Sequence, residues 1–333
     1  MAKYAKTSNQ AARTVAKLQI LSREQKANSE VQCIKSLGTA RDYESCIKRV
    51  NDWAKEKYNT NIEHMTVDQA KEYLTERSRQ VTQKTLDQER HAIQKVMQYI
   101  TGELKQIGDS KVVMKHMKGH TVQLTEKVFE TIDRNEFLSK KEKELESRAL
   151  TKEQFEKVLE KLPPEHKLSA ELAYYCGFRA HELLIIQRAN EIELTIRPEK
   201  HQSEYKFAGL KDFTLYRAPG KGGRVNEFAV PNNLAQRLEA VRLAKPETIR
   251  DRGINRVKYY DLKGGQAFSQ AFSRACKAAL GFSVGAHGLR HSDAQNRMIT
   301  LQNELGISRY DAKEAVSQEL GHWRASITET YLR

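Results

Sequence analysis

The sequence predicts a mainly helical protein of two domains, with a small antiparallel β-sheet in the second. Apolar residues recur at three- or four-residue spacing through most of the chain, which is typical of amphipathic helices. Two short apolar segments flank a glycine-rich turn, which is typical of a β-hairpin. The 333 residues are enough to bury two separate hydrophobic cores.

Residues 39–108 are predicted to form a small helical domain. They carry three apolar stripes at helical spacing, and Gly102 and Gly108 follow the third. The stripe residues are Tyr43, Ile47, Val50 and Trp53, then Val67, Ala70 and Leu74, and finally Leu86, Ile93, Val96, Met97 and Ile100 after a Thr82–Thr85 start.

The second domain, residues 148–333, begins with clear helix signals. Thr151 and Gln154 form a capping-box pair in front of an apolar stripe. Two prolines at positions 163–164 end that helix, because proline lacks the backbone donor that a helix interior needs. A further helix is expected over residues 168–176.

The small sheet is predicted from the segments that follow. Residues 191–196 alternate apolar and polar side chains, which predicts a half-buried strand. Residues 213–217 and 225–230 form two more strands, joined by the turn-forming segment 218–224 as a hairpin. From Gln266 onward the pattern returns to helices.

The net charge of +14 predicts a polyanionic partner. Lysine and arginine number 57 against 43 acidic residues, and basic surfaces bind nucleic acid through counterion release. A basic surface without such a partner is the alternative. Residues 1–38 are a basic N-terminal segment, helical or disordered, that we interpret as a DNA-contacting arm or, alternatively, a transit peptide. Residues 109–147 are lysine-rich and are interpreted as a partly helical region that contains the interdomain linker.

The cysteines and hydropathy predict a cytoplasmic protein. Cys33, Cys46, Cys176 and Cys276 are scattered without a C-x-x-C pair, as expected of reduced thiols. No apolar run approaches the roughly 20 residues of a membrane helix, and the start lacks the apolar centre of a signal peptide. We therefore expect no membrane association.

Several separated side chains are suited to phosphate chemistry, although each alone fits an ordinary structural role such as a helix junction, a turn lysine or a helix cap. They are Arg179 after Gly177, Lys221 in the hairpin loop, His287 and Arg290 in a His-x-x-Arg pair, His322 after Gly321, and Tyr331 near the end of the chain. Glu182 is either an orienting group of this site or a solvated helix carboxylate.

His287 and His291 also have the four-residue spacing with which two imidazoles share a metal ion on a helix. No glutamate lies between them, and Gly288 would weaken a helix there, so a zinc site is the weaker interpretation. We therefore expect neither a metal ion nor another cofactor.

The order and spacing of these residues resemble the active-site signature of the tyrosine recombinases. This family includes phage and mobile-element integrases and bacterial chromosome-dimer resolvases. The resemblance rests on Arg179, Lys221, the pair His287-x-x-Arg290 and the segment Gly321-His322-x8-Tyr331. It implies that residues 148–333 form the catalytic domain and that residues 39–108 form the helical core-binding domain.

Two features depart from the family pattern. Between Arg290 and His322 there are 31 residues, several more than is common, and an extra turn or loop around Leu305–Asp311 would account for them. Only two residues follow Tyr331, whereas many relatives continue into a helix that docks on the neighbouring protomer. The resemblance therefore leaves open how protomers are coupled, and a trimmed C-terminus is the alternative explanation.

The resemblance implies a specific chemistry. Tyr331 would attack a phosphodiester and form a 3′-phosphotyrosine bond, which releases a 5′ hydroxyl. The two arginines and His322 would bind the non-bridging phosphate oxygens, since a guanidinium offers paired, permanently charged donors. His287 would act as general base and Lys221 as general acid. Because the ester is conserved, rejoining would need no ATP, and the arginines would replace a metal ion.

The implied function is site-specific DNA recombination, with integration and excision of a mobile element as the leading interpretation. Chromosome or plasmid dimer resolution by the same chemistry is the alternative. A type IB topoisomerase and an inactive DNA-binding relative are rival classes; the integrase-like ending at Tyr331 argues against the first, and the complete residue set argues against the second. The implied partners are double-stranded DNA, three further copies in a homotetramer on paired DNA sites, and accessory DNA-bending proteins.

Overall fold

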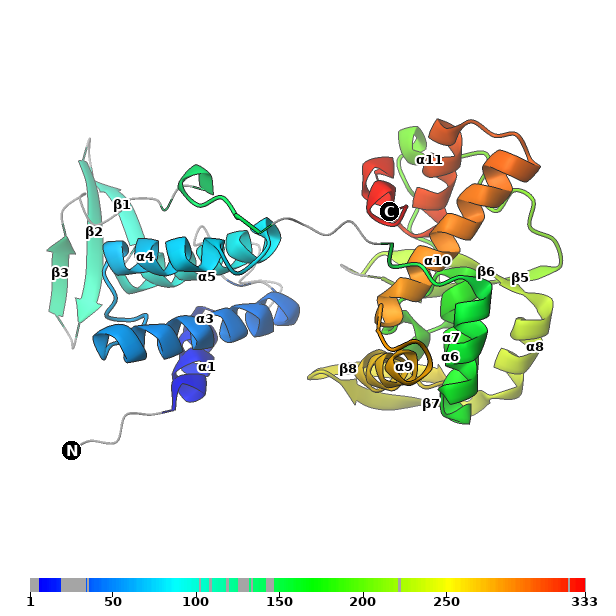
Figure 1. Ribbon diagram of the computed structural model, residues 1–333, viewed down its shortest axis with the longest axis horizontal. Coiled ribbons are helices and arrows are strands. Elements are labelled where there is room, and N and C mark those ends of the chain that lie inside the picture. The colour runs from blue at the N-terminus through cyan, green and yellow to red at the C-terminus, as the bar shows by residue number, and fades with distance from the viewer. Residues whose placement is uncertain are drawn as a thin grey trace. The chain divides into compact units, whose positions relative to one another are not determined.

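The computed structural model divides into two compact units, residues 1–144 (unit 1) and residues 145–333 (unit 2). Helices are the main regular structure of each unit, and each also contains short strands (Figure 1). The described residues are 6–18, 34, 36–101, 103–107, 110–117, 120–124, 132, 134–141, 147–220, 223–322 and 324–332.

Unit 1 contains the three helices that the sequence predicts within residues 39–108. Its described elements are α1 (Thr7–Leu18), α3 (Leu37–Tyr58), α4 (Val67–Ser78), α5 (Gln83–Thr101), β1 (Glu103–Ile107), β2 (Ser110–Met117), β3 (His120–Leu124) and η2 (Arg134–Glu136). Ser36 starts α3 by accepting the backbone N–H of Thr39 at 3.0 Å. The predicted stripes face the core, where Ile47, Val50 and Ile93 are fully buried.

A buried carboxylate joins the three helices. Glu89 of α5 is fully buried and accepts hydrogen bonds from Arg77 at 2.8 and 2.9 Å, from Arg49 at 3.0 Å and from the hydroxyl of Tyr73 at 3.0 Å. Burial alone would raise the pKa of Glu89, but the bonds and charge of Arg77 keep that pKa below its ordinary value. The charge is therefore retained inside unit 1 and fixes how α3, α4 and α5 pack.

A three-stranded antiparallel sheet follows α5, in the order β1-β2-β3. Lys115 pairs with Val122, and Lys105 pairs with Val112. The sheet occupies part of the region that we interpreted as a partly helical linker, so the helical prediction is wrong for residues 110–124. The valines and threonines of this segment favour extended backbone, which explains the absence of a helical period.

The helical interpretation of the basic N-terminal segment is confirmed for residues 7–18. Ala11, Val15 and Leu18 of α1 are buried in the core of unit 1. The hydroxyl of Thr14 donates to Glu63 at 2.9 Å. This part of the segment is therefore a packed helix rather than an extended arm.

Unit 2 combines helices with two small antiparallel sheets in its described part. Its elements are α6 (Lys152–Lys161), α7 (Pro164–Cys176), η3 (Glu182–Leu184), β4 (Gln187–Arg188), η4 (Glu199–His201), β5 (Phe213–Pro219), β6 (Val225–Pro231), α8 (Asn232–Ala240), β7 (Arg242–Asp251), β8 (Ile254–Tyr260), α9 (Gly265–Leu280), α10 (Ala286–Ile299), η5 (Thr300–Glu304), α11 (Arg309–Glu319) and η6 (Ala325–Thr330). Helices α6, α7, α9 and the first turn of α10 pack around one apolar core.

The helix signals at the start of unit 2 are confirmed. The hydroxyl of Thr151 accepts the N–H of Gln154, whose side chain accepts the N–H of Thr151 in return. Helix α6 ends at Lys161, before the two prolines. Pro164 is the first residue of α7, so the helix predicted over 168–176 starts one turn earlier.

The predicted hairpin is confirmed, but one predicted strand is wrong. Strands β5 and β6 pair antiparallel, and β4 joins them in the order β4-β5-β6. Residues 191–196 are irregular and touch the sheet through Thr195, which bonds to the backbone of Val225. Ile196 is 80% exposed, so the alternating apolar side chains do not share a buried face.

Strands β7 and β8, which the sequence analysis did not predict, form a separate two-stranded ribbon. It contains Pro246 and many charged residues, and such a composition hides the alternation on which strand prediction depends. Cross-strand pairing runs from Glu247 with Lys258 to Asp251 with Ile254.

We expect Glu89→Ala to lower the free energy of unfolding of unit 1 by about 3–5 kcal/mol, because it leaves buried donors without their carboxylate. Urea unfolding followed by Trp53 fluorescence in a Trp323→Phe background measures this. Glu56→Ala, which removes an exposed glutamate of α3, is the matched control and should change the free energy by less than about 0.5 kcal/mol. Equal effects of the two substitutions would contradict the prediction.

Candidate active site

Tyr331 closes η6, and its ring is packed among three imidazoles. Only 6% of Tyr331 is exposed. The centroid of its ring lies 5.4 Å from that of His287, 4.7 Å from that of His291 and 5.0 Å from that of His322. Helix α11 packs on η6 and holds this segment against α10 (Figure 1).

Helix α10 supplies one side of the site. It carries His287, Arg290 and His291 in its first turns, and the four-residue spacing places both imidazoles against Tyr331. Beyond α10 the chain makes the π-helical turn η5 and a short loop at residues 305–308 before α11 begins. The loop at 305–308 falls within the range where the sequence analysis places an extra turn or loop, and the π-helical turn lies just before that range.

Arg290 is fully buried beneath Tyr331. Its guanidinium donates to the carbonyl oxygens of Gly177 and Leu320, at the ends of α7 and α11. Its Cζ lies 5.8 Å from the centroid of the Tyr331 ring, and its Nε has no hydrogen-bond partner among the described residues. Burial and the nearby Arg179 lower the pKa of Arg290. The site therefore holds a desolvated cation with unused donor capacity.

Glu182 holds the two arginines on one carboxylate. It is fully buried, and it accepts the side chain of Arg179 at 2.6 Å and the backbone N–H of Arg179 at 2.7 Å. Its other contact is with Nη1 of Arg290 at 4.0 Å. The interpretation of Glu182 as a solvated helix carboxylate is wrong, because η3 turns this side chain into the core.

The hairpin that carries Lys221 has its base beside Glu182, although Lys221 and Gly222 themselves lie outside the described residues. A Cβ on Gly220 would lie 3.2 Å from Oε1 of Glu182 and 2.6 Å from the amide nitrogen of Asn226. This close approach requires glycine. It also places the start of the loop against the carboxylate that holds the arginines.

His322 is fixed by its backbone. Gly321 has a left-handed φ of 66° after the end of α11, as the predicted helix cap requires. The N–H of His322 donates to the carbonyl of Ser317 at 2.8 Å, and the carbonyl of His322 accepts the guanidinium of Arg197. Arg197 also donates to the Ser317 carbonyl at 3.2 Å.

Arg197 is a residue that sequence reasoning missed. It is 9% exposed, and burial lowers its pKa to about 10. It follows the segment 191–196, where the interpretation as a strand directed attention to the apolar residues. The main partners of Arg197, the carbonyl oxygens of Ser317 and His322, lie 120 and 125 residues away in sequence, so no local pattern singled it out.

His291 is the second missed residue, since the sequence suggested for it only a role in a zinc site. Its ring lies nearest to Tyr331, with an interplanar angle of 38°. Helix α10 includes Gly288, contrary to the expectation of a weakened helix, because a Cβ there would lie 2.7 Å from the carbonyl of Arg148. Within the described ranges, no group of three His, Cys, Asp or Glu side chains is arranged to hold a metal ion.

The imidazoles around Tyr331 are held neutral. Burial, followed by the charge of Arg290, lowers the pKa of His287 to about 3. The same two causes lower the pKa of His322 far below its ordinary value, and burial with the charge of Arg148 lowers the pKa of His291 to about 4. A neutral imidazole keeps one nitrogen as an acceptor, so the rings beside Tyr331 are able to take a proton or a hydrogen bond.

Other predicted features have the following outcomes. Cys46, Cys176 and Cys276 are free thiols, and Cys33 lies outside the described residues. Among the helices that the structure describes, none combines the length and hydropathy needed to span a membrane.

Comparisons with known proteins agree with this architecture. Residues 30–103 match the family model of the N-terminal SAM-like domain of phage integrases. The fold of the chain is similar to that of the XerH site-specific recombinase in a post-cleavage complex with palindromic difH substrate. The TM-score is 0.50 at 14% sequence identity, and the match covers 100% of this chain and 94% of that chain. No curated protein matches the sequence.

Two further solved structures are similar at lower scores. A pre-cleavage complex of XerH with difH has a TM-score of 0.48 at 16% identity, covering 99% of this chain and 94% of that chain. The XerA recombinase has a TM-score of 0.36 at 12% identity, covering 98% and 94%. The predicted resemblance to the tyrosine recombinase and phage integrase family is thus confirmed in the N-terminal family model and in the recombinase fold.

The depressed histidine pKa values predict that unit 2 loses stability as the pH falls from about 6.5 toward 4. His287, His291 and His322 stay neutral when folded and bind protons when unfolded, where a histidine pKa is about 6.5, so acid favours unfolding. Asp293 opposes this with one proton, because burial raises its pKa to about 7. Three histidines lose stability on acidification and one aspartate gains it, so the free energy of unfolding of unit 2 falls as the pH falls.

We expect His322→Gln to reduce this pH slope by up to about 1.4 kcal/mol per pH unit, the value of one proton. Urea unfolding of unit 2 between pH 7 and 5, followed by Trp323 fluorescence in a Trp53→Phe background, measures the slope. An unchanged slope would show that His322 is protonated equally in the folded and unfolded states.

Proposed function

We propose that the chain is a site-specific DNA recombinase in which Tyr331 cleaves and rejoins DNA through a 3′-phosphotyrosine bond. The observation that carries this proposal is the packing of the Tyr331 ring against His287 and His322, above the buried guanidinium of Arg290. A tyrosine in contact with acceptor imidazoles and a cation has what a phosphoryl-transfer nucleophile needs.

In the proposed step the hydroxyl oxygen of Tyr331 attacks the phosphorus, and the bond from phosphorus to the 5′ oxygen breaks. The phenol proton passes to neutral His287, and Lys221 gives a proton to the departing 5′ oxygen. Reversal by a 5′ hydroxyl restores the diester and frees Tyr331. The phosphoester is conserved throughout, so the cycle requires neither ATP nor a metal ion.

The transition state places extra negative charge on the non-bridging phosphate oxygens. Arg179, Arg290 and His322 are the proposed donors to these oxygens. Donors positioned before the reaction are worth about 10²- to 10³-fold in rate each. Arg290 is fully buried, so a phosphate would reach it only after the side chains that cover it have moved.

The proposed biological role is integration and excision of a mobile element, which the match of residues 30–103 to a phage-integrase domain supports. Double-stranded DNA is the proposed partner, and the XerH relatives were solved bound to their difH substrate. Assembly as a homotetramer on paired sites, help from accessory DNA-bending proteins and a nucleoid-associated location in the cytoplasm belong to the same proposal. Dimer resolution by the same chemistry is the alternative role.

We expect a covalent protein–DNA adduct when the protein is incubated with nicked duplexes in EDTA without ATP and then denatured with SDS. The duplexes should include segments that flank its own gene. Tyr331→Phe should abolish the adduct, because it removes the nucleophilic oxygen. Tyr310→Phe is the matched control, since Tyr310 is a 68% exposed tyrosine of the same unit and should leave the yield unchanged.

The outcomes separate the rival classes. An adduct that persists in Tyr331→Phe would show that another residue is the nucleophile. Sequence-selective binding without any adduct would favour an inactive DNA-binding relative. Cleavage without site preference would favour a type IB topoisomerase.

We expect Lys221→Ala to slow cleavage by about 10²- to 10⁴-fold, because the 5′ oxygen then leaves without a proton. A substrate with sulfur in place of that 5′ bridging oxygen should restore most of the rate, since a thiolate leaves without protonation. Arg290→Ala is the contrasting variant and should stay slow on both substrates. Equal defects of Lys221→Ala on oxygen and sulfur substrates would exclude the general-acid role.

A further inference from the structure

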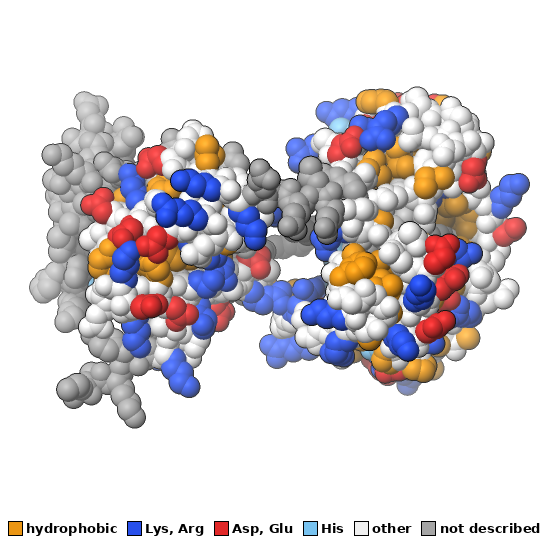
Figure 2. Space-filling model, in the orientation of Figure 1, with side chains coloured by type: hydrophobic (Ala, Val, Ile, Leu, Met, Phe, Trp, Pro, Cys, Tyr) orange, Lys and Arg blue, Asp and Glu red, His pale blue; other side chains and the backbone are white. Residues whose placement is uncertain are grey.

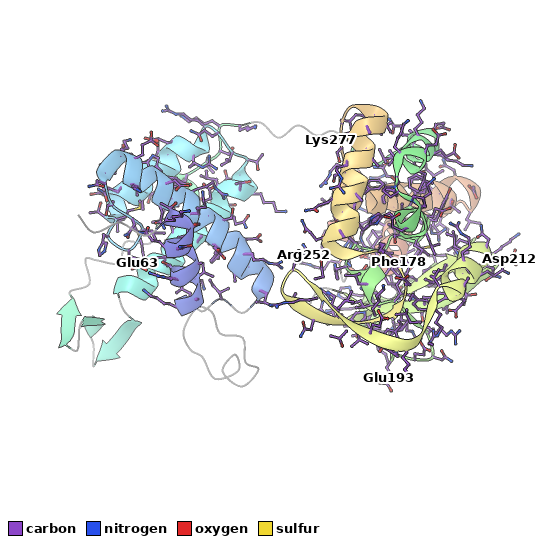
Figure 3. The ribbon with its side chains drawn as sticks, turned by 90° about the horizontal axis from the view of Figure 1, so that it is seen from below. Glu63, Phe178, Glu193, Asp212, Arg252 and Lys277 are labelled. Atoms are coloured by element: carbon purple, nitrogen blue, oxygen red, sulfur yellow. The ribbon has the colours of Figure 1, made fainter. Side chains whose placement is uncertain are left out.

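The β7–β8 ribbon projects from unit 2 beyond α9 (Figures 1 and 3). It is a two-stranded sheet of its own, with β7 at Arg242–Asp251 and β8 at Ile254–Tyr260. Figure 2 shows that Lys and Arg side chains gather at the end of unit 2 that this ribbon forms. Neither the proposed cleavage chemistry nor the core of unit 2 accounts for the outer part of this element.

One face of the ribbon is turned inward and anchored. The register places Ile249, Asp251 and Lys258 on this face, and Asp251 and Lys258 are buried. The carboxylate of Asp251 accepts the N–H of Gln266 at the start of α9 at 3.0 Å. Lys258 donates to Asp261 at 2.7 Å. The bond of Asp251 fixes the ribbon to α9, and the bond of Lys258 joins β8 to the residue that follows Tyr260.

The other face is exposed over the outer part of the ribbon, from Thr248 to Val257. Thr248 lies opposite Val257, and Arg250 lies opposite Asn255, so the four side chains share this face. All four are exposed, Val257 by 45%. The set contains no acidic residue, and Arg250 forms no ion pair with any residue that the structure describes.

The tip of the ribbon is a two-residue turn that presents a further cation. Arg252 and Gly253 have left-handed φ angles of 47° and 78°, the arrangement of a tight hairpin turn between Asp251 and Ile254. A left-handed conformation is uncommon for a residue with a side chain. Figure 3 shows Arg252 at the outermost point of the hairpin.

The ribbon lies next to the candidate active site. Strand β8 packs against η3, the turn that carries Glu182. Burial lowers the pKa of His181, and the charges of Arg256, Arg179 and Arg252 lower it further. Two arginines from the end of the ribbon and one proposed phosphate-binding arginine therefore act on the same imidazole. A DNA duplex with its reactive phosphate at Arg179 would pass close to the ribbon.

We propose that the outer face of the β7–β8 ribbon enters the major groove of that duplex and reads base edges, which rests on the proposed function. The major groove is about 12 Å wide and admits a two-stranded ribbon. Arginine pairs with the two acceptors of guanine, asparagine pairs with adenine, and apolar groups, including the methyl group of threonine, contact the thymine methyl group. Arg250, Asn255, Val257 and Thr248 supply this set.

The composition of the face favours DNA bases over other anionic partners. Phosphate binding alone requires cations, yet three of the four residues on this face are uncharged. An acidic peptide would be bound by several lysines and arginines. The amide of Asn255 and the exposed side chain of Val257 would not contribute to such binding. Base edges in a groove require donors, acceptors and apolar contacts together.

The test uses full-length protein with Tyr331→Phe, so that binding is measured without cleavage. Its preferred sequence is selected from a pool of random duplexes at about 150 mM salt, and binding to that duplex is then compared with binding to single-base variants. We expect Arg250→Ala and Asn255→Ala each to reduce the preference at one or two base pairs by about 5- to 150-fold. Affinity for random duplex should change by less than about 5-fold.

Two comparisons make the result specific. Arg250→Lys keeps the charge but loses the paired donors, so it should lose base preference as Arg250→Ala does. Lys277→Ala removes an exposed cation at the C-terminal end of α9, distant from Arg252 in Figure 3, and should leave the selected sequence unchanged.

Unchanged base preference in Arg250→Ala and Asn255→Ala would overturn the inference, as would full retention of preference in Arg250→Lys. Selective binding to RNA in place of duplex DNA would also overturn it. These outcomes are independent of cleavage. If sequence selection depends on the ribbon but the protein with Tyr331 forms no adduct, only the catalytic proposal is refuted. If the adduct forms but selection does not depend on the ribbon, only the ribbon proposal is refuted.

Discussion

The buried guanidinium of Arg290 bonds to the carbonyl oxygens of Gly177 and Leu320 and lies 4.0 Å from a carboxylate oxygen of Glu182. Removing a partner from a buried charge costs about 3–5 kcal/mol. The two carbonyl oxygens and the Glu182 carboxylate are therefore held in position around the guanidinium. Gly177 ends α7, and Leu320 ends α11. Since η6 packs on α11, the position of Tyr331 over the guanidinium follows from the same bonds.

Burial and the charge of this cation together keep His287 and His322 neutral. Arg290 carries its charge where no water screens it, and it shares Glu182 with Arg179, so two positive charges face one negative charge. The imidazoles of His287 and His322 avoid a further positive charge by staying neutral. A phosphate would supply the missing negative charge, and the proton affinity of both imidazoles would then rise. The acceptor beside the Tyr331 hydroxyl would thus strengthen when substrate binds.

Sequence patterns correctly predicted the elements whose formation depends on interactions between residues close in sequence. The capping pair at Thr151 and the hairpin pairing of β5 with β6 depend on neighbouring residues, and both are found as predicted. The alternation of apolar and polar side chains in residues 191–196 wrongly predicted a strand, because burial of those side chains depends on which distant residues pack against them. Arg197 and Glu182 gain their importance from partners that are distant in sequence, such as His322 and Arg290. The spacing of such residues in the sequence identifies them as site residues only when a known family pattern includes them.

Under the proposed function, unit 2 would both bind a phosphate and recognise a sequence. Groups that bind a phosphate meet the same atoms on every DNA, so Arg179 and Arg290 in their proposed role would carry no sequence information. Recognition requires contacts in a groove, at a fixed distance from the phosphate that is cut. Strand β8 packs on η3, and η3 carries the carboxylate that holds both arginines. The distance between a base read by Arg250 and the phosphate bound by Arg179 would therefore be fixed through η3. The ribbon would then define the cleavage position as well as the sequence.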